Sequence, residues 1–259
     1  MLAKKNSRGR QAPEEADRLR LVMIHGAGQS AGLWRAQVAG LSPTVEALAL
    51  DLPGHGTSTW DKGRHGIAAY ADYVLDALAG TPLQYVVLCG HSMGGAVVQR
   101  LLLDHTRLFR AGILVNTGAR LRVRREFLDL IEQDYAQFVD LIYCQCVAPG
   151  NQTPSLQDHF RKISECPADV ALSDFLACDR FDAMDQIGRI QVPVLAVGAE
   201  QDRLTPVKYS AYLADNIPGA RLRILPATGH YAPLENPTAL NGLIAEFLAF
   251  LTGSAAADG

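Results

Sequence analysis

No apolar run in the 259-residue sequence reaches the length of a membrane-spanning helix. The N-terminal arm carries Lys4, Lys5, Arg8 and Arg10 and lacks the apolar segment of a secretory signal. With a net charge of −3, the sequence lacks the excess of basic residues that binds nucleic acid or an anionic membrane. These absences predict a cytoplasmic protein with no nucleic-acid partner and no membrane insertion.

Cysteine is scarce, and its spacing fits neither a disulfide framework nor a metal site. The count is odd, Cys144 and Cys146 are too close for a Cys-x-x-Cys motif, and no histidine pair stands near them at ligand spacing. We therefore expect free thiols, no metal and no cofactor. The cysteines concerned are Cys89, Cys144, Cys146, Cys166 and Cys178.

What the sequence does contain is an ordinary globular composition, with 48% hydrophobic and 20% charged residues. Short apolar runs alternate with helical patterns, and fully apolar strands between amphipathic helices indicate an α/β fold with a doubly wound, mostly parallel sheet. Strands are expected at Leu19–Ile24, Val45–Leu50, Tyr85–Cys89, Pro193–Val197 and Leu222–Leu225, and Ala111–Val115 adds a sixth. Helices are expected at Leu33–Leu41, Ile67–Leu78, Ala96–Asp104, Val207–Ala214 and Pro237–Leu251.

Strand signals are missing between Gly118 and Ile190. Two long helical segments, Leu121–Val147 and Leu156–Met184, occupy this stretch, and we interpret them as a helical cap inserted after the sixth strand. The predicted organisation is a flexible N-terminal arm at 1–18, a core domain at 19–118 and 190–252, and the cap at 119–189.

The pattern that carries most chemical information is Gly90-His91-Ser92-Met93-Gly94, which follows an apolar run and precedes a helical pattern. In that setting a very tight strand-to-helix turn pushes Ser92 out on a strained backbone. Gly90 and Gly94 flank it, where a Cβ would meet the opposing backbone. Ser92 is the predicted nucleophile, and it requires a base, an orienting acid and an oxyanion hole elsewhere in the chain.

Candidates for the acid and the base follow the last two predicted strands. Asp202 comes just after Pro193–Val197, where a carboxylate can turn inward to accept a hydrogen bond from imidazole, and Glu200 competes for this role. His230 lies in the loop before the final helix and can act first as general base and then as general acid.

The oxyanion hole needs two backbone N–H groups at the strand ends. Met93 supplies one, because it follows the nucleophile at a helix start where N–H groups are free. Ala27 supplies the other, from the loop after the first long strand, in which Gly26 and Gly28 permit close backbone approach.

The chain order Ser92, Asp202, His230 is that of the α/β-hydrolase fold, and the sequence resembles this superfamily from about Leu19 to Leu251. The resemblance implies a serine esterase with a helical cap and an acyl-enzyme intermediate, and it implies a structural role for His55. The matching motifs are His25-Gly26, Asp51-Leu52-Pro53-Gly54-His55-Gly56-Thr57-Ser58, Gly90-His91-Ser92-Met93-Gly94-Gly95, Asp202 with Pro206, and Gly229-His230 with Glu235-Asn236-Pro237.

Some similarity to the plant hydroxynitrile lyase and methylesterase group is also present. The segment from Gly26 to Trp34 is similar to that group, and Met1–Arg18 lacks the strand hairpin with which many α/β-hydrolases begin. Lyases of the group usually need a Lys near the catalytic histidine, whereas Tyr231 follows His230 here. Lyase chemistry is therefore disfavoured.

The predicted activity is that of a carboxylesterase acting on a small-molecule ester of small or medium acyl size, as a monomer or homodimer. A C–C bond hydrolase is the alternative, kept open by Tyr231 and by Arg180 in the cap; a lactonase, a thioesterase and a non-catalytic ligand receptor are the others. The predicted substrate pocket has apolar walls. Its members are Trp34, Phe138, Tyr143, Phe175, Leu204 and Tyr231.

Overall fold

The computed structural model describes residues 18–42, 44–59 and 65–253. The predicted arm at 1–18 lies outside this part of the chain except for its last residue. Within the described ranges, no helix is both long enough and apolar enough to cross a membrane.

A parallel sheet of six strands forms the centre of the molecule, in the order β2-β1-β3-β4-β5-β6, and it confirms the predicted fold class. Each neighbouring pair is parallel, so each strand end that carries a functional loop lies at the same edge. The strands begin and end within two residues of the predicted limits. They are β1 Arg20–Ile24, β2 Glu46–Leu50, β3 Val86–His91, β4 Ala111–Val115, β5 Val194–Ala199 and β6 Arg221–Leu225.

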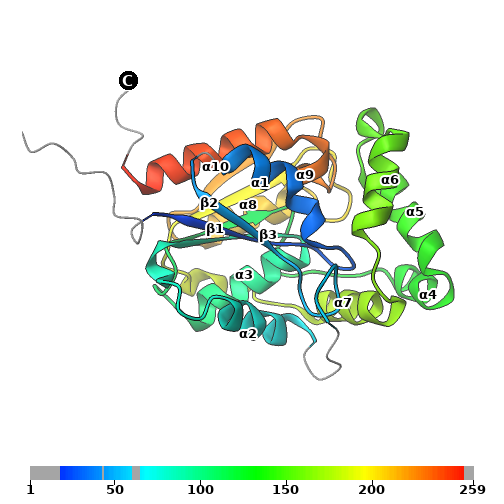
Figure 1. The fold of residues 1–259 in the computed structure, drawn as a ribbon, viewed down its shortest axis with the longest axis horizontal. Coiled ribbons are helices and arrows are strands. Elements are labelled where there is room, and N and C mark those ends of the chain that lie inside the picture. The colour runs from blue at the N-terminus through cyan, green and yellow to red at the C-terminus, as the bar shows by residue number, and fades with distance from the viewer. Residues whose placement is uncertain (1–17, 43, 60–64, 254–259) are drawn as a thin grey trace, which may run out of the picture.

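Helices cover both faces of the sheet, and each face has its own cluster of buried apolar side chains. Helices α1 and α10 lie over one face and α2 and α3 over the other, as Figure 1 shows. The helices of the core are α1 Arg35–Leu41, α2 Ile67–Ala77, α3 Met93–Asp104, α8 Val207–Asn216, α9 Ala232–Glu235 and α10 Pro237–Leu251. Short 3₁₀ turns occur at Ala31–Trp34, Leu83–Tyr85, Pro149–Asn151 and Ile187–Arg189.

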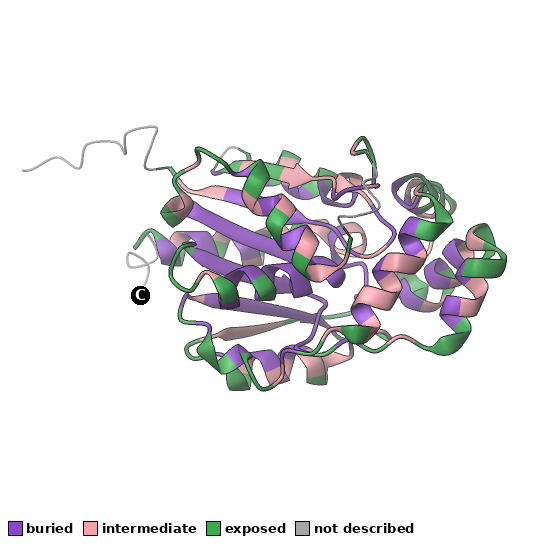
Figure 2. Cartoon of the chain, turned by 90° about the horizontal axis from the view of Figure 1, so that it is seen from below, coloured by how far each residue is buried: buried purple, intermediate pink, exposed green. Residues whose placement is uncertain are grey.

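The chain between β4 and β5 is helical and projects beyond the carboxyl ends of the strands (Figures 1 and 2). Ala111–Val115, the sixth strand to be named in the prediction, is β4, the fourth strand in chain order. The helical segment follows it. Each of the two predicted long helices is divided, the first at Asp134, whose side chain caps the next helix, and the second before Pro167. The four resulting helices are α4 Arg125–Gln133, α5 Tyr135–Cys146, α6 Pro154–Ile163 and α7 Ala168–Arg180.

The two ends of this helical segment lie side by side. An isolated antiparallel bridge joins Arg120 to Asp182, and the Ala183 N–H donates to the Ala119 carbonyl at 2.7 Å. The segment therefore leaves and re-enters the core through a narrow neck next to β4 and β5. The domain limits given above remain a prediction, although this neck falls close to them.

Candidate active site

Ser92 occupies a strained turn between β3 and α3. Its φ of 50° lies in the left-handed region, which non-glycine residues seldom adopt. A Cβ at Gly90 would overlap the backbone of Gly94, and a Cβ at Gly94 would overlap the Ile24 carbonyl of the neighbouring strand. The strand and the helix can therefore meet this closely only with glycine at both positions, which places the Ser92 side chain on an open edge of the sheet.

Strand β4, on the other side of β3 from β1, holds the strained turn in place. The Ser92 N–H donates to the Val115 carbonyl at 3.0 Å, and the Thr117 hydroxyl donates to the Ser92 carbonyl at 2.8 Å. Both partners lie at the end of β4 or just beyond it. The cost of the positive φ is thus offset by hydrogen bonds from an element far away in sequence.

The His230 ring faces the Asp202 carboxylate beneath the same edge of the sheet. Its Nδ1 lies 3.0 Å from Oδ1 and 2.9 Å from Oδ2, and both residues are almost fully buried. An ionised carboxylate only accepts hydrogen bonds, so the proton sits on Nδ1 and the Nε2 lone pair is free to accept another. This is the tautomer that a general base next to a serine requires.

Backbone and side-chain hydrogen-bond donors surround the Asp202 carboxylate. Its oxygens accept hydrogen bonds from the backbone N–H groups of Leu204 and Thr205, from the Thr205 hydroxyl at 2.7 Å and from the Asn116 amide at 2.8 Å. Burial by itself raises the pKa of this carboxyl, but His230 and the Thr205 donors outweigh it and hold the pKa well below its usual range. Asp202 therefore stays ionised at neutral pH.

The competing carboxylate, Glu200, has a different contact. It accepts a hydrogen bond from the Ala227 N–H at 3.0 Å and is exposed.

His91, the other histidine near Ser92, donates from Nε2 to the His230 carbonyl at 2.9 Å. Burial, together with the nearby His230, lowers the pKa of His91 to about 3, so it remains neutral and supports the His230 loop.

Two backbone N–H groups are free near the nucleophile. Within the described residues neither the Met93 N–H, at the first position of α3, nor the Ala27 N–H donates a hydrogen bond. His25 orients the second of these groups, because its Nδ1–H donates to the Gly26 carbonyl at 2.8 Å. The C=O and N–H of a trans peptide point in opposite directions, so this bond directs the Ala27 N–H away from His25.

The same loop is tied to the cap by a buried carboxylate that the sequence analysis missed. Asp174 of α7 is completely buried, and it accepts hydrogen bonds from the Gly28 N–H at 2.9 Å, from His55 Nε2 at 2.9 Å and from the Tyr70 hydroxyl at 2.6 Å. Although burial alone would lower the pKa of His55, the Asp174 carboxylate raises it to about 10. His55 is thus a charged partner that holds the cap on the core.

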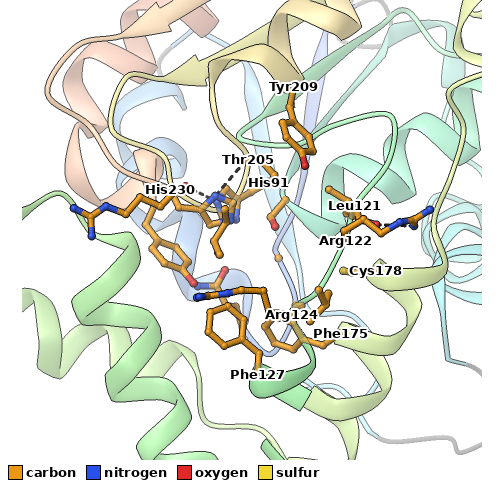
Figure 3. Close-up of a pocket in the computed structure, with 18 residues that line it drawn as sticks. His91, Leu121, Arg122, Arg124, Phe127, Phe175, Cys178, Thr205, Tyr209 and His230 are labelled. Carbon is orange, nitrogen blue, oxygen red and sulfur yellow. Dashed lines mark hydrogen bonds between the residues drawn. The ribbon is translucent and has the colours of Figure 1, made fainter. Parts of the chain in front are cut away.

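Ser92 and His230 line one cavity of about 150 Å³ between the core and the cap. Within the described residues no hydrogen bond joins the Ser92 hydroxyl to the His230 ring, a contact that often tightens only when substrate binds. Of the predicted pocket residues, Phe175, Leu204 and Tyr231 line this cavity. Figure 3 shows Phe175 and Phe127 on the cap side of it, opposite His230.

The other three predicted pocket residues, Trp34, Phe138 and Tyr143, do not line this cavity. Phe138 packs against the rings of Phe127 and Phe175 inside the cap, at 5.7 and 5.1 Å between centroids. The Tyr143 hydroxyl donates to the Thr153 carbonyl, and Trp34 is fully buried. Each aromatic side chain thus packs in the interior, which sequence spacing alone does not distinguish from a pocket wall.

Arg180, which kept the C–C hydrolase alternative open, lines a separate cavity between α7 and the core that does not contain Ser92. Among the described residues, no cluster of three or more His, Cys, Asp or Glu side chains could hold a metal ion. The five cysteines are free thiols. The reactive groups that the described site brings together are a serine hydroxyl, an imidazole and a carboxylate.

Comparison with known proteins agrees with this architecture. The sequence matches the model of the alpha/beta hydrolase family over residues 21–243, and the chain belongs to that family.

Its relatives include enzymes that act on esters. A 3-oxoadipate enol-lactonase of Acinetobacter baylyi is 26% identical over 239 residues, which are 88% of this chain and 87% of the relative. A pimeloyl-[acyl-carrier protein] methyl ester esterase of Yersinia enterocolitica is 26% identical over 88% of this chain and 92% of its own length. The solved structure of a thermophilic esterase is similar with a TM-score of 0.77 and 30% identity, over 89% of this chain and 90% of that one.

Proposed function

We propose that this protein is a serine hydrolase that cleaves carboxylic esters of small or medium acyl size through an acyl-enzyme intermediate. The observation that carries the proposal is the buried hydrogen bond between His230 and Asp202 at the wall of the cavity that Ser92 enters. The same three residues follow strand ends in the order that α/β-hydrolases use.

The first half of the reaction forms the acyl-enzyme. The Ser92 Oγ attacks the ester carbonyl carbon while its proton passes to His230 Nε2, and the electron pair of the C=O bond moves onto oxygen. The free N–H groups of Ala27 and Met93 stabilise that oxyanion. When the tetrahedral intermediate collapses, the C–O bond to the alcohol breaks and the leaving oxygen takes the proton from His230.

The second half reverses these roles with water. His230 removes a proton from water, the resulting hydroxide attacks the acyl carbon, and the carboxylic acid leaves as Ser92 regains its proton. Asp202 remains ionised throughout and stabilises the imidazolium that forms twice in each cycle.

The size of the cavity supports short substrates. Its volume of about 150 Å³ is modest for a ligand pocket, and its apolar lining includes Phe127, Phe175 and Leu204. Lactones are a second candidate, favoured by the similarity to an enol-lactonase. A lactone is a cyclic ester and follows the same steps, with the leaving alcohol still attached to the acyl group.

The test is the Ser92→Ala variant, assayed with p-nitrophenyl acetate and with γ-butyrolactone. Loss of the nucleophile is expected to lower kcat by a factor on the order of 10⁴ or more without change in the unfolding midpoint. Ser155→Ala, at an exposed serine of α6, is the matched control and should keep full activity.

Labelling separates an enzyme from a ligand receptor of the same fold. A fluorophosphonate should modify wild-type protein once per chain and should leave Ser92→Ala unmodified. Turnover that persists in Ser92→Ala would contradict the acyl-enzyme mechanism, and stoichiometric binding without turnover would indicate a receptor.

A further inference from the structure

The active-site cavity has a positively charged wall. Arg122, Arg124 and Arg203 contribute to its lining, and among the described residues that line it none is Asp or Glu. A neutral ester needs no such wall, so the charge is unexplained by ester hydrolysis alone.

Arg124 differs from its neighbours in having no carboxylate partner within the described part of the chain. Arg125 pairs with Asp129 at 2.8 Å, and Arg161 pairs with Asp140 at 2.7 Å. The Arg124 guanidinium instead donates from Nη2 to the Gln145 side-chain oxygen at 2.8 Å, and its carbon lies 4.0 Å from the centre of the Phe127 ring.

These two uncharged contacts fix the guanidinium and leave most of it free. One face is stacked on Phe127, and one of its five N–H donors is used by Gln145. Figure 3 shows Arg124 beside Phe127, extending across the cavity, whereas Arg122 extends away from it. Arg122 also donates to the backbone carbonyls of Leu121 and Asp179. Arg124, although exposed to solvent, therefore presents free, oriented donors at the wall of the cavity.

We propose that Arg124 binds a carboxylate carried by the substrate at the end remote from the ester bond. A planar guanidinium with two adjacent free N–H groups matches the two oxygens of a carboxylate. Apolar side chains, among them Phe127, Phe175 and Leu204, line the same cavity as Ser92 and Arg124. The preferred substrates are then short esters with one anionic end. This inference rests on the proposed ester hydrolysis.

The anionic end can lie on the acyl or on the alcohol side of the ester, and matched substrates distinguish the two. Monomethyl adipate carries its carboxylate on the acyl side, and dimethyl adipate is its neutral counterpart. The compound 4-acetoxybenzoate carries it on the alcohol side, with methyl 4-acetoxybenzoate as its counterpart. The measured quantity is the ratio of kcat/KM for the anionic and the neutral member of each pair.

For at least one pair the wild-type ratio should exceed one, and Arg124→Gln should lower it about tenfold, mostly through KM, while leaving the neutral member unchanged. Arg124→Lys should keep part of the preference, because the charge remains but the fork geometry is lost. Arg125→Gln removes the same charge outside the cavity and should leave the ratio as in wild type. A ratio that is the same in wild type and Arg124→Gln for both pairs would overturn the proposal.

A binding measurement separates this inference from the proposed function. Calorimetric titration of the Ser92→Ala variant with adipate needs no turnover. Binding of adipate that is lost in the Ser92→Ala, Arg124→Gln double variant supports the anion site even if no ester is hydrolysed. Turnover of neutral esters with no effect of Arg124→Gln on adipate binding leaves ester hydrolysis standing and overturns the site.

Discussion

Asp202 and Glu200 stand two residues apart and differ in what their carboxylates face. Asp202 contacts His230 at 2.9 Å inside the protein, while Glu200 caps an exposed turn through the Ala227 N–H. Asp202→Asn presents an amide to Nδ1 and favours the wrong imidazole tautomer, so kcat is expected to fall by about 10³–10⁴ with little change in folding. Glu200→Gln is the matched control and should lower kcat less than twofold. Equal losses in both variants, measured on p-nitrophenyl acetate, would contradict the assignment.

At the same scale, sequence reasoning located the residues that stand at strand ends in recognisable motifs. Ser92, Asp202 and His230 belong to that group, and the structure brings them to one edge of the sheet. The partners Asn116 and Thr205 were not identified, because a lone Asn or Thr after a strand carries no pattern. Asn116 reaches Asp202 because β4 and β5 are neighbours in the sheet, and Thr205 reaches it through the turn of the loop that both residues share.

Among the elements, α7 has the strongest connection to the site. Its Asp174 receives donors from Gly28, His55 and Tyr70, and so links the cap to the loop that carries the Ala27 N–H. In the Asp174→Asn variant the side chain offers these donors one acceptor oxygen instead of two, so at least one donor is left unpaired. We expect this to lower the free energy of unfolding by about 1–3 kcal/mol. If the loop positions the oxyanion hole, kcat should also fall, by about tenfold, with KM little changed.

The control for this variant is Asp169→Asn, an exposed acid in the first turn of the same helix, which should cost no more than about 0.5 kcal/mol. Active sites are counted with fluorophosphonate so that kcat refers to folded protein. A loss of stability with an unchanged kcat per active site would assign Asp174 a structural role alone.

The elements themselves were predictable to different degrees. The strands are short, and each was found within two residues. The inner strands β1, β3, β4 and β5 are buried and leave continuous apolar runs, whereas the edge strands β2 and β6 are partly exposed and β6 carries Arg221 and Arg223. The cap was recognised by its missing strands, but its helices were predicted as two instead of four. The division at Asp134 depends on a side-chain cap within an otherwise continuous helical pattern, which periodicity does not detect.

For the whole molecule, buried histidines set the pH range in which the fold is most stable. Burial lowers the pKa of His25, and of His91 likewise, to about 3, while the unfolded chain takes up these protons near pH 6.5. Their contribution is therefore complete above about pH 6.5 and is lost as the pH falls toward 3. His55 acts in the opposite sense, because its pKa of about 10 in the folded state means that its contribution is lost as the pH rises from 6.5 to 10.

Denaturant unfolding between pH 4 and 10 should therefore show a maximum of stability between about pH 6 and 7. His55→Gln should be less stable at neutral pH and should show a flatter decline from pH 7 to 9.5 than wild type. The same slope in both proteins would show that other groups, such as the buried Cys89 thiol, whose pKa burial raises, cause the alkaline loss.

The narrow neck of the cap has a consequence for how this architecture can diversify. The cap leaves the core after β4 and returns before β5, and these strands are hydrogen-bonded neighbours whose register pairs Gly112 with Val194. The neck between them is already closed by the pairing of Arg120 with Asp182. A replacement segment of another length or shape has to match those two adjacent ends and to supply a carboxylate for Gly28, His55 and Tyr70, as Asp174 does. Ser92, His230 and Asp202 belong to the core, so we expect a graft at this neck that keeps the carboxylate of Asp174 to change the substrate specificity and to keep the proposed reaction.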